Sequence, residues 1–584
     1  MPNLRSQSFA AVALAAVLTS SCGGTEPAQP QPTAPAASQP GAPAPLPPPA
    51  VPLASLPKID GAAILQTTTV MSSDKFQGRA PGTVGEDISV GYLETQFRDL
   101  GLEPGNPDGT YIQKVPLVGI TGTEAKPLTF SKAGETGTMK WKDDVVAWTR
   151  HVADGASIDK SDVIFAGYGV EAPEYGWDDF KGLDVKGKTL VVLVNDPAIP
   201  DPANPSTLDP KMFGGNAMTY YGRWTYKFEQ GARKGAAAVL IVHETLPAGY
   251  PFSVVQGNLN EKFDLVAPDK NMKKANIEGW ITLNAARKLF AMAGQDFDTL
   301  KKQAISKDFK PVPLGVKASM GIRNKLRTID SRNVIAKLQG SDPVLKDEYV
   351  VYSAHWDHLG VGAPVNGDAI YNGALDNASG VATVLEIAKA LKQARPQPKR
   401  SFLFLMVTAE EKGLIGSEYY SLNPLYPLAK TAANINIDGV NQWGRTKDIS
   451  VVGLGASELD DYLRQAAQEQ GRTLTPDPEP EKGFYYRSDH FNFAKQGVPA
   501  LDPDSGVDFI GKSADWGKTK RDEYTEKDYH APSDQVKADW DLSGAVEDAQ
   551  LLMAVGYRVA NADRMPEWKA GNEFKAKRDA MLRK

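Results

Sequence analysis

Two apolar runs and one amphipathic run organise the middle of the chain. Residues 349–354 and 401–408 are rich in aliphatic and aromatic side chains and predict buried strands. Between them, residues 380–392 carry apolar side chains at helical spacing and predict a helix. Buried strands that alternate with helices indicate an open α/β sheet whose strands are largely parallel.

Polar side chains follow both predicted strands. His355 and Asp357 come after the first strand, and Glu410 and Glu411 come after the second. Asp376 lies between them in a Gly/Ala/Ser turn that precedes the predicted helix. Because an open α/β sheet keeps its ligand site at the carboxyl ends of its strands, we expect these side chains to line one site.

Similar residues follow two later segments. Asp438 ends an apolar run within 431–444, and His530 lies in the polar loop 528–536. Histidine and carboxylate groups are zinc ligands, and two zinc ions about 3.5–4 Å apart need a carboxylate that bridges them. Asp376 suits this bridge because its turn lies between two ligand-bearing strands. The candidate metal ligands are His355, Asp376, Glu411, Asp438 and His530.

Two further acids suit other tasks at such a site. In the adjacent pair Glu410 and Glu411, one carboxylate can bind metal while the other stays free as a base. Asp357 lies two residues beyond His355 and points the same way along an extended chain, so it can accept the second imidazole N–H. The sequence therefore predicts a di-metal site with a general base and an orienting carboxylate.

Residues 160–310 have the character of a separate unit. Strand-like runs such as GKTLVVLVNDP alternate with a helix, a glycine turn and a buried strand in WTYKFEQGARKGAAAVLIVHE. A loop rich in Pro, Gly, Asn and Tyr, 197–222, separates them. His151 and His243 have no partner at ligand spacing, so we assign both to packing or to the surface.

Composition narrows the class of protein. The 584 residues are 41% hydrophobic and 23% charged, which is typical of globular domains, and the length exceeds that of one domain. The formal net charge is −6, and the lysines and arginines are scattered. We therefore expect no nucleic-acid partner. With one cysteine, Cys22, the chain forms no internal disulfide.

The first 22 residues predict an export signal. Arg5 precedes the apolar core FAAVALAAVL, which is too short to span a bilayer. Small residues lead into Cys22, and this pattern resembles a bacterial lipoprotein signal, although Leu18 lies four positions before the cysteine where three is usual. The alternative is a cleaved signal with an incidental cysteine. Residues 23–57, rich in Pro and Ala, predict a disordered tether.

Six motifs carry a resemblance to a known family: SAHWDHLG, GALDNASGV, TAEEKGLIGS, NIDGV, RSDHFNF and YHAPSD. In this order they resemble the zinc exopeptidase family that holds secreted bacterial leucine aminopeptidases, with glutamate carboxypeptidase II, the transferrin receptor and glutaminyl cyclase as relatives. The resemblance covers residues 60–120 and 325–560. The segment between them resembles the protease-associated domain that is inserted in many secreted exopeptidases.

The resemblance implies a role for each candidate ligand. It places His355 and Asp438 on one zinc ion, Glu411 and His530 on the other, and Asp376 between the two. The implied cofactors are thus two zinc ions. The same ligands also accept cobalt or manganese, so the native metal is not predicted.

The resemblance also implies roles for other residues. Glu410 becomes the general base for a water that bridges the metals, and Tyr529 matches a tyrosine that hydrogen-bonds the tetrahedral oxyanion. Arg487 and Asp489 match a segment that lines the site. Two histidines have no ligand counterpart and are assigned to the rim, to packing or to structure: His358 and His490.

The implied activity is hydrolysis of N-terminal residues from peptide substrates. Three alternatives stay open. The first is a metallo-carboxypeptidase, in which Arg487 or Arg445 would hold the substrate's carboxylate. The second is a glutaminyl cyclase-like enzyme with a single zinc ion. The third is an inactive binding protein of the transferrin-receptor kind. Residue preference and oligomeric state are not predicted.

The expected fold is α/β: a mixed, largely parallel sheet flanked by helices, with a di-metal site at the strand carboxyl ends and an inserted β-rich protease-associated domain. The expected location is the bacterial cell envelope, lipid-anchored through Cys22 and facing the periplasm, or secreted if Cys22 is not lipidated. The predicted parts are a signal peptide (1–22), a tether (23–57), an N-terminal peptidase part (58–150), the protease-associated domain (151–315), the zinc peptidase domain (325–565) and a charged tail (566–584).

Overall fold

The computed structural model describes residues 49–256 and 261–583. By its contacts the chain divides into Met1–Pro45 and Leu46–Lys584, and every described residue belongs to the second unit. The predicted signal peptide, Cys22 and most of the predicted tether lie outside the described residues. No helix in these described ranges is both long and apolar enough to cross a membrane.

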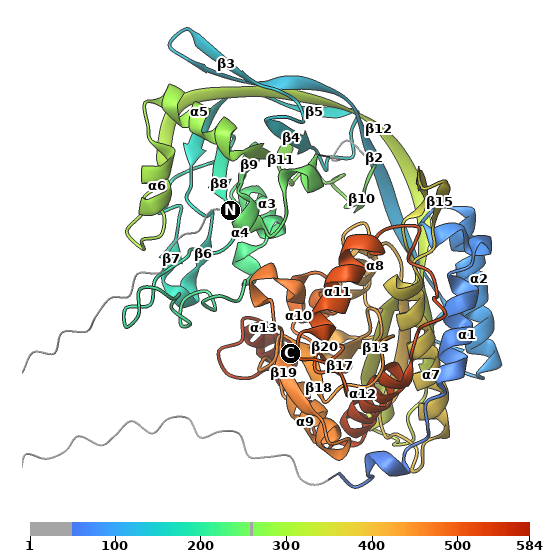
Figure 1. Ribbon diagram of the computed structural model, residues 1–584. Coiled ribbons are helices and arrows are strands. Elements are labelled where there is room, and N and C mark those ends of the chain that lie inside the picture. The colour runs from blue at the N-terminus through green and yellow to red at the C-terminus, as the bar shows by residue number, and fades with distance from the viewer. Residues whose placement is uncertain (1–48, 257–260, 584) are drawn as a thin grey trace, which may run out of the picture. The chain divides into compact units, whose positions relative to one another are not determined.

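One continuous sheet runs through the described chain (Figure 1). We call residues 112–332 the insert and the remaining described residues the main domain. The main-domain strands, in their order across the sheet, are β19 (Thr473–Pro476), β18 (Asp448–Val452), β20 (Ala500–Asp504), β17 (Thr431–Asn436), β13 (Tyr349–His355) and β16 (Ser401–Val407), followed by β12 (Val312–Leu338), which the insert shares.

The centre of the main-domain sheet is parallel. β16, β13, β17 and β20 run in the same direction, whereas β12 and β18 join this set antiparallel. The predicted strands at 349–354 and 401–408 correspond to β13 and β16. The expected mixed, largely parallel sheet is thus confirmed, and the carboxyl ends of its central strands meet at one edge.

Helices cover both faces of this sheet. Successive side chains of a strand point to opposite faces, so Val350 and Phe404 enter one core while Val351 and Leu405 enter another. The helices of the first core are α1 (Gly61–Met71), α2 (Val84–Asp99), α7 (Gly380–Gln393), α9 (Leu459–Glu469) and α12 (Ser543–Asn561). The second core takes residues from α8 (Ile415–Leu422) and α10 (His490–Lys495). The remaining main-domain helices are α11 (Trp516–Lys527) and α13 (Lys575–Leu582).

Helix α7 confirms the helix predicted at 380–392, and its first residue must be small. A Cβ atom on Gly380 would lie 2.1 Å from Oδ1 of Asn377 and 2.6 Å from the carbonyl oxygen of Ile437. Only glycine therefore lets the start of α7 approach the chain that leaves β17. This close approach brings the Asp376 turn next to the end of that strand.

The insert has an α/β arrangement of its own. Its parallel strands are β5 (Gly155–Phe165), β8 (Thr189–Leu193), β9 (Ala238–His243) and β11 (Ile277–Thr282). Four further strands pair antiparallel: β4 (Val145–Trp148) with β11, β2 (Ile112–Lys132) with β12, and both β3 (Glu135–Met139) and β10 (Lys262–Leu265) with β2. Its helices are α3 (Trp224–Arg233), α4 (Thr245–Ala248), α5 (Leu283–Ala293) and α6 (Phe297–Gln303).

Two long strands connect the insert to the main domain. β2 and β12 pair antiparallel along most of their length, and β12 also pairs with β5 at one end and with β16 at the other. Leu128, Phe130 and Met139 pack in the core of the insert, although they precede the predicted boundary at 150/151. Short strands complete the sheet structure: β1 (Glu103–Pro104), β6 (Glu171–Ala172), β7 (Trp177–Asp178), β14 (Gly360–Val365) and β15 (Asp368–Tyr371).

Candidate metal centre

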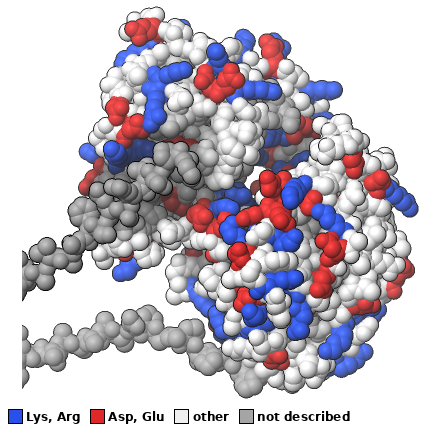
Figure 2. All heavy atoms as spheres, in the orientation of Figure 1, with Lys and Arg blue, Asp and Glu red and all other residues white. Residues whose placement is uncertain are grey.

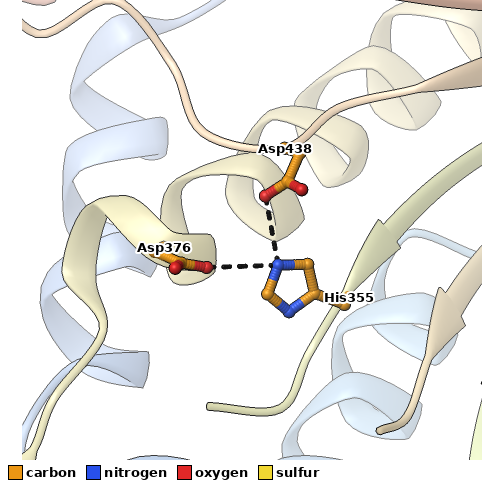
Figure 3. A group of neighbouring side chains, drawn as sticks. All are labelled: His355, Asp376 and Asp438. Carbon is orange, nitrogen blue, oxygen red and sulfur yellow. Dashed lines mark hydrogen bonds and ion pairs between the residues drawn. The ribbon is translucent and has the colours of Figure 1, made fainter. Parts of the chain in front are cut away.

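The first group of candidate ligands forms around His355 (Figure 3). This histidine ends β13 and is almost fully buried. Its Nε2 atom lies 3.2 Å from Oδ1 of Asp376 and 3.1 Å from Oδ1 of Asp438. Asp376 comes from the turn before α7, and Asp438 from the chain just after β17. Three segments far apart in sequence thus place their donor atoms together.

A second group lies on the other side of Asp376. Nε2 of His530 is 3.2 Å from Oδ2 of Asp376 and 3.0 Å from Oε2 of Glu411. The two oxygens of Asp376 therefore face two different histidines, one in each group. This is the geometry expected of a carboxylate that bridges two metal ions.

The donor atoms fit a divalent metal. One nitrogen or oxygen from each of His355, Asp376 and Asp438 lies within 4.8 Å of the others, and the same holds for His358, Asp376 and Glu411. Imidazole nitrogen combined with carboxylate oxygen is a donor set that zinc takes. The second of these sets contains His358 where the sequence predicts His530. The ion-pair contacts nevertheless bring all five predicted ligands together through Asp376, and their role as ligands stays a prediction.

His358 is placed differently from the sequence expectation. It is fully buried, so it does not lie at a rim. Its Nδ1 atom lies 2.5 Å from Oε1 of Glu411, and its ring packs against Gly373. Two donors on one tetrahedral zinc, each about 2.0–2.1 Å from the ion, would be about 3.3 Å apart. The shorter contact places His358 against Oε1 of Glu411 as an ion-pair neighbour, while Oε2 of Glu411 stays turned toward His530.

Asp357 contacts His355 through its backbone and not, as expected, through its carboxylate. The carbonyl oxygen of Asp357, not its carboxylate, lies 3.0 Å from Nδ1 of His355. The carboxylate is 3.8 Å away and accepts the backbone N–H of Glu410 at 3.1 Å. The difference arises because the chain turns after β13. Asp357 thus links the ends of β13 and β16, and burial raises its pKa to about 7.

The pKa values of the candidate base Glu410 and of its neighbour Glu411 are shifted in opposite directions. Burial, followed by repulsion from Asp438 and Glu411, raises the pKa of Glu410 well above its usual value. Burial and Asp376 also act to raise the pKa of Glu411, but contacts with His358 and His530 bring it down to about 2. Oε2 of Glu410 lies 4.0 Å from Nε2 of His355, so both glutamates belong to the same site. Within it, Glu410 favours the protonated form and Glu411 the ionised form.

Backbone contacts fix the turn that carries Asp376. The carboxylate of Asp534 accepts the backbone N–H groups of Leu375 and Asp376 at 3.0 and 3.1 Å. Arg79 is fully buried and donates hydrogen bonds to the carbonyl oxygens of Trp356, Asn372 and Gly373 among others. Sequence reasoning missed both residues, although Asp534 ends the YHAPSD motif and Arg79 lies in the Gly-rich stretch FQGRAPG.

The remaining predicted residues lie around the two groups. Ser488 donates a hydrogen bond of 2.7 Å to Oδ2 of Asp438, and Asp489 accepts one of 2.6 Å from Ser417. Tyr529 stacks on His530 with ring centroids 3.9 Å apart and keeps nearly half of its surface exposed. Burial and the nearby carboxylates raise the pKa of Tyr529. His490 is buried, and burial lowers its pKa to about 3.

Comparison with known proteins relates this centre to a family. Residues 333–554 match the model of Peptidase family M28. Leupeptin-inactivating enzyme 1 of Streptomyces exfoliatus is 31% identical over 208 residues, which cover 35% of this chain and 43% of that protein. Aminopeptidase NAALADL1 of Mus musculus is 35% identical over 131 residues, which cover 22% of this chain and 16% of that protein.

This chain therefore spans less than half the length of either relative. A solved structure, the aminopeptidase from Aneurinibacillus sp. strain AM-1, is 18% identical with a TM-score of 0.47 and covers 87% of this chain and 96% of that chain. The family match runs from the end of β12 through most of α12 and includes all five candidate ligands. Through residues 333–554, this chain is similar to peptidase family M28.

Proposed function

We propose that this chain is a di-zinc aminopeptidase that removes N-terminal residues from peptides. The observation that carries the proposal is that the two oxygens of Asp376 face His355 on one side and His530 on the other, with Glu410 beside them. One relative is named an aminopeptidase, which supports this reaction class. The proposed ligands are His355 and Asp438 for one zinc ion, Glu411 and His530 for the other, and Asp376 for both.

Each nearby side chain has a task in this reaction. Zinc, when bound, would supply positive charge that acidifies water and polarises a peptide carbonyl. Glu410 would accept the proton of the attacking water and return it to the leaving amine, a role that its raised pKa suits. Tyr529, whose raised pKa keeps the hydroxyl protonated, would donate a hydrogen bond to the developing oxyanion.

Specific contacts weigh against the alternatives. A single-zinc cyclase would use one group of ligands, whereas two groups share Asp376 here. An inactive binding protein is disfavoured because the proposed ligands and the base all lie at the same site. For a carboxypeptidase, Arg445 is a poor carboxylate receptor because it already pairs with Glu547 at 2.6 Å. Arg487, by contrast, has no anionic partner among the described residues, so the substrate test decides this alternative.

The test compares four kinds of substrate with and without a chelator: leucine p-nitroanilide, free dipeptides, N-acetylated dipeptides and a peptide with N-terminal glutamine. We expect hydrolysis of leucine p-nitroanilide, and of dipeptides with a free N-terminus, that is lost with chelator and restored by zinc. N-acetylated dipeptides should be poor substrates. Preferential cleavage of N-acetylated dipeptides would instead identify a carboxypeptidase, and cyclisation of N-terminal glutamine would identify a cyclase. No metal-dependent reaction with any of them would refute the proposal.

The location is a second part of the proposal. Lipidation at Cys22 and the Pro/Ala-rich stretch 23–57 would hold the enzyme at a bacterial envelope membrane, facing the periplasm. On the face drawn in Figure 2, cationic and anionic side chains are interspersed. Wild type should partition with membranes and Cys22→Ser should not. A mature N-terminus mapped elsewhere by mass spectrometry would contradict lipidation.

We also propose that the insert acts as a protease-associated domain that restricts access to the centre. It contributes none of the five proposed ligands, and its loop 197–222 reaches the main domain, where the N–H of Met218 donates to the carbonyl of Pro480 at 3.0 Å. Shortening this loop should change the rate for long peptides relative to dipeptides while zinc content stays the same. Loss of zinc in such a variant would contradict this division of roles.

A further inference from the structure

Two arginines, one from the insert and one from the main domain, lie close to each other beside the metal centre. Arg223 follows the short helix η4 (Tyr220–Gly222), and Arg487 follows η10 (Phe484–Tyr486). The two segments are in contact, because the rings of Tyr220 and Tyr486 have centroids 5.8 Å apart. The two guanidinium groups are close enough to repel each other.

Neither arginine has an anionic partner among the residues that the structure describes. The Nε atoms of both are buried and have no hydrogen-bond partner. Arg487 donates to the carbonyl oxygen of Lys482 at 2.7 Å, and the Arg223 side chain makes no hydrogen bond within this part of the chain. Lys495, near the same contact, is neutralised by Glu229 at 2.7 Å. The arginine pair is thus an exception to local charge pairing.

Without a bound anion, the two neighbouring guanidinium groups are electrostatically unfavourable. Burial and then repulsion from Arg487 lower the pKa of Arg223 to about 10. Burial also lowers the pKa of Arg487, with Tyr250 and Tyr529 as the neighbours that oppose this shift. Both side chains are half-buried, with Nε atoms that have no partner among the described residues, and a carboxylate between two guanidinium groups gains several charge-assisted hydrogen bonds. The arrangement therefore favours a bound anion.

The position of the pair suggests which anion. Arg487 interacts with Tyr529, and Tyr529 stacks on His530 of the metal centre. Since one tyrosine ring separates Arg487 from His530, a carboxylate one or two residues beyond the reacting carbonyl fits this place, because an extended chain advances about 3.3–3.6 Å per residue. A peptide that presents its N-terminal bond to the centre presents its C-terminus on the leaving-group side.

We propose that Arg223 and Arg487 together form a carboxylate-binding subsite that selects short peptides, with the C-terminal carboxylate of a dipeptide or tripeptide as the ligand. An acidic side chain just beyond the cleaved bond offers the same chemistry. The inference rests on the proposed aminopeptidase function and adds a substrate class to it. Because one arginine comes from each domain, the subsite exists only when the insert contacts the main domain.

The experiment measures kcat/KM for three matched peptides: Leu-Gly, Leu-Gly-amide and Leu-Asp-amide. The wild type should prefer Leu-Gly over Leu-Gly-amide by about 10- to 100-fold, the factor expected for one or two hydrogen bonds to a charged group. In Arg223→Gln and Arg487→Gln this ratio should fall toward one, mainly through KM. The matched control Arg445→Gln should keep the wild-type ratio, because Arg445 is already paired with Glu547.

The third peptide separates the two sources of carboxylate. If Leu-Asp-amide is cleaved as well as Leu-Gly, and this depends on both arginines, the subsite takes the acidic side chain as well. The Lys variants of both positions keep the charge and should retain an intermediate ratio, which guards against variants that do not fold. A wild-type ratio near one, or a ratio that survives both Gln substitutions in folded protein, overturns the subsite.

Failure of the proposed function gives a different result. If the wild type hydrolyses neither leucine p-nitroanilide nor any of the peptides, the aminopeptidase assignment is wrong. The subsite is then tested by calorimetry, with N-acetylglycine as the probe and N-acetylglycinamide as its uncharged match. Binding of N-acetylglycine that is lost in Arg223→Gln supports the subsite, and equal binding or no binding of the two probes refutes it.

Discussion

The insert and the main domain both place acids and histidines after parallel strands, yet only the main domain gathers its acids without an ion pair to a lysine or arginine of the described chain. The nearest buried cation, Arg79, donates its hydrogen bonds to backbone carbonyls. In the insert, Asp196 follows β8 and His243 ends β9; in the main domain, His355 ends β13 and Glu411 follows β16. The topology at these strand ends is similar. The difference lies in what each acid contacts.

The acids of the insert are balanced by basic side chains. Asp196 interacts with Lys227, and Asp264 forms ion pairs with Arg150 and Lys274 at 3.2 and 2.6 Å. In the main domain, the ion-pair contacts of the clustered acids are with histidines, and no lysine or arginine of the described chain takes part. These acids are Asp357, Asp376, Glu410, Glu411 and Asp438. Such a cluster indicates a place for cations that the chain itself does not supply.

Metal removal should have the largest effect and should act on the main domain alone. A chelator should abolish hydrolysis, because the carboxylates lose the cations that hold them together, and added zinc should restore it. Removal should also lower the melting temperature, since a ligand bound only to folded protein stabilises it. Calorimetry with and without chelator measures this. If the melting temperature is unchanged and activity is full in chelator, the acids of the main domain do not form a metal site.

Separating the adjacent glutamates sharpens the comparison within the main domain. Glu410→Gln should retain two zinc ions and lose roughly 10²–10⁴-fold in kcat, because the base is gone while the ligands remain. Glu411→Ala should lower the zinc content toward one per chain. Metal analysis and steady-state kinetics check both. Loss of metal in Glu410→Gln with two metals kept in Glu411→Ala would show that the roles are exchanged.

Two buried histidines allow a matched test of the two regions. His358→Gln should weaken zinc binding by about 10- to 100-fold, the usual effect of removing a group that holds a ligand, because Glu411 loses its contact at 2.5 Å. His243→Gln, at a similarly buried position after a parallel strand of the insert, should leave zinc affinity unchanged. Competition with a zinc chelator of known affinity gives both values. Equal effects would mean that His358 does not act through the metal centre.

Breaking a charge pair in the insert should affect stability and not metal binding. Lys227 is nearly fully buried and its Nζ atom donates to the carbonyl oxygen of Asn195 at 3.1 Å. Lys227→Met removes the cation near Asp196 and leaves the Asn195 carbonyl without its hydrogen bond, which should cost about 1–3 kcal/mol of folding free energy. Denaturant unfolding measures the loss. Zinc content should stay at two per chain, and a drop would show that the insert supports the metal centre directly.

The smallest expected effect is a pH dependence within the insert. Burial raises the pKa of Asp179 to about 7. The folded state therefore binds more protons than the unfolded state between about pH 4, the unfolded value, and pH 7, so stability falls as the pH rises through this window. Asp179→Asn should flatten that slope in melting temperature, whereas Asp308→Asn, at an exposed position, should not. A wild-type stability that rises over this window would contradict the prediction.

The sequence determined the elements that carry the centre. Runs of apolar residues specified β13, β16 and the helix α7, because burial on both faces of a sheet requires nearly continuous hydrophobicity. Residue type and order at the strand ends, together with six motifs, identified the candidate ligands from the sequence alone. These inferences depend on local patterns, which one chain displays directly.

Only the tertiary structure decided which atoms meet. The sequence could not show that His358 contacts Glu411, or that the carbonyl of Asp357 lies nearer to His355 than its carboxylate does, because both depend on how the chain turns after β13. The pairing of Arg223 with Arg487 joins residues from two domains, and no spacing in the sequence encodes that contact. Strand ends are set by local hydrophobicity, whereas side-chain partners are set by packing between distant segments.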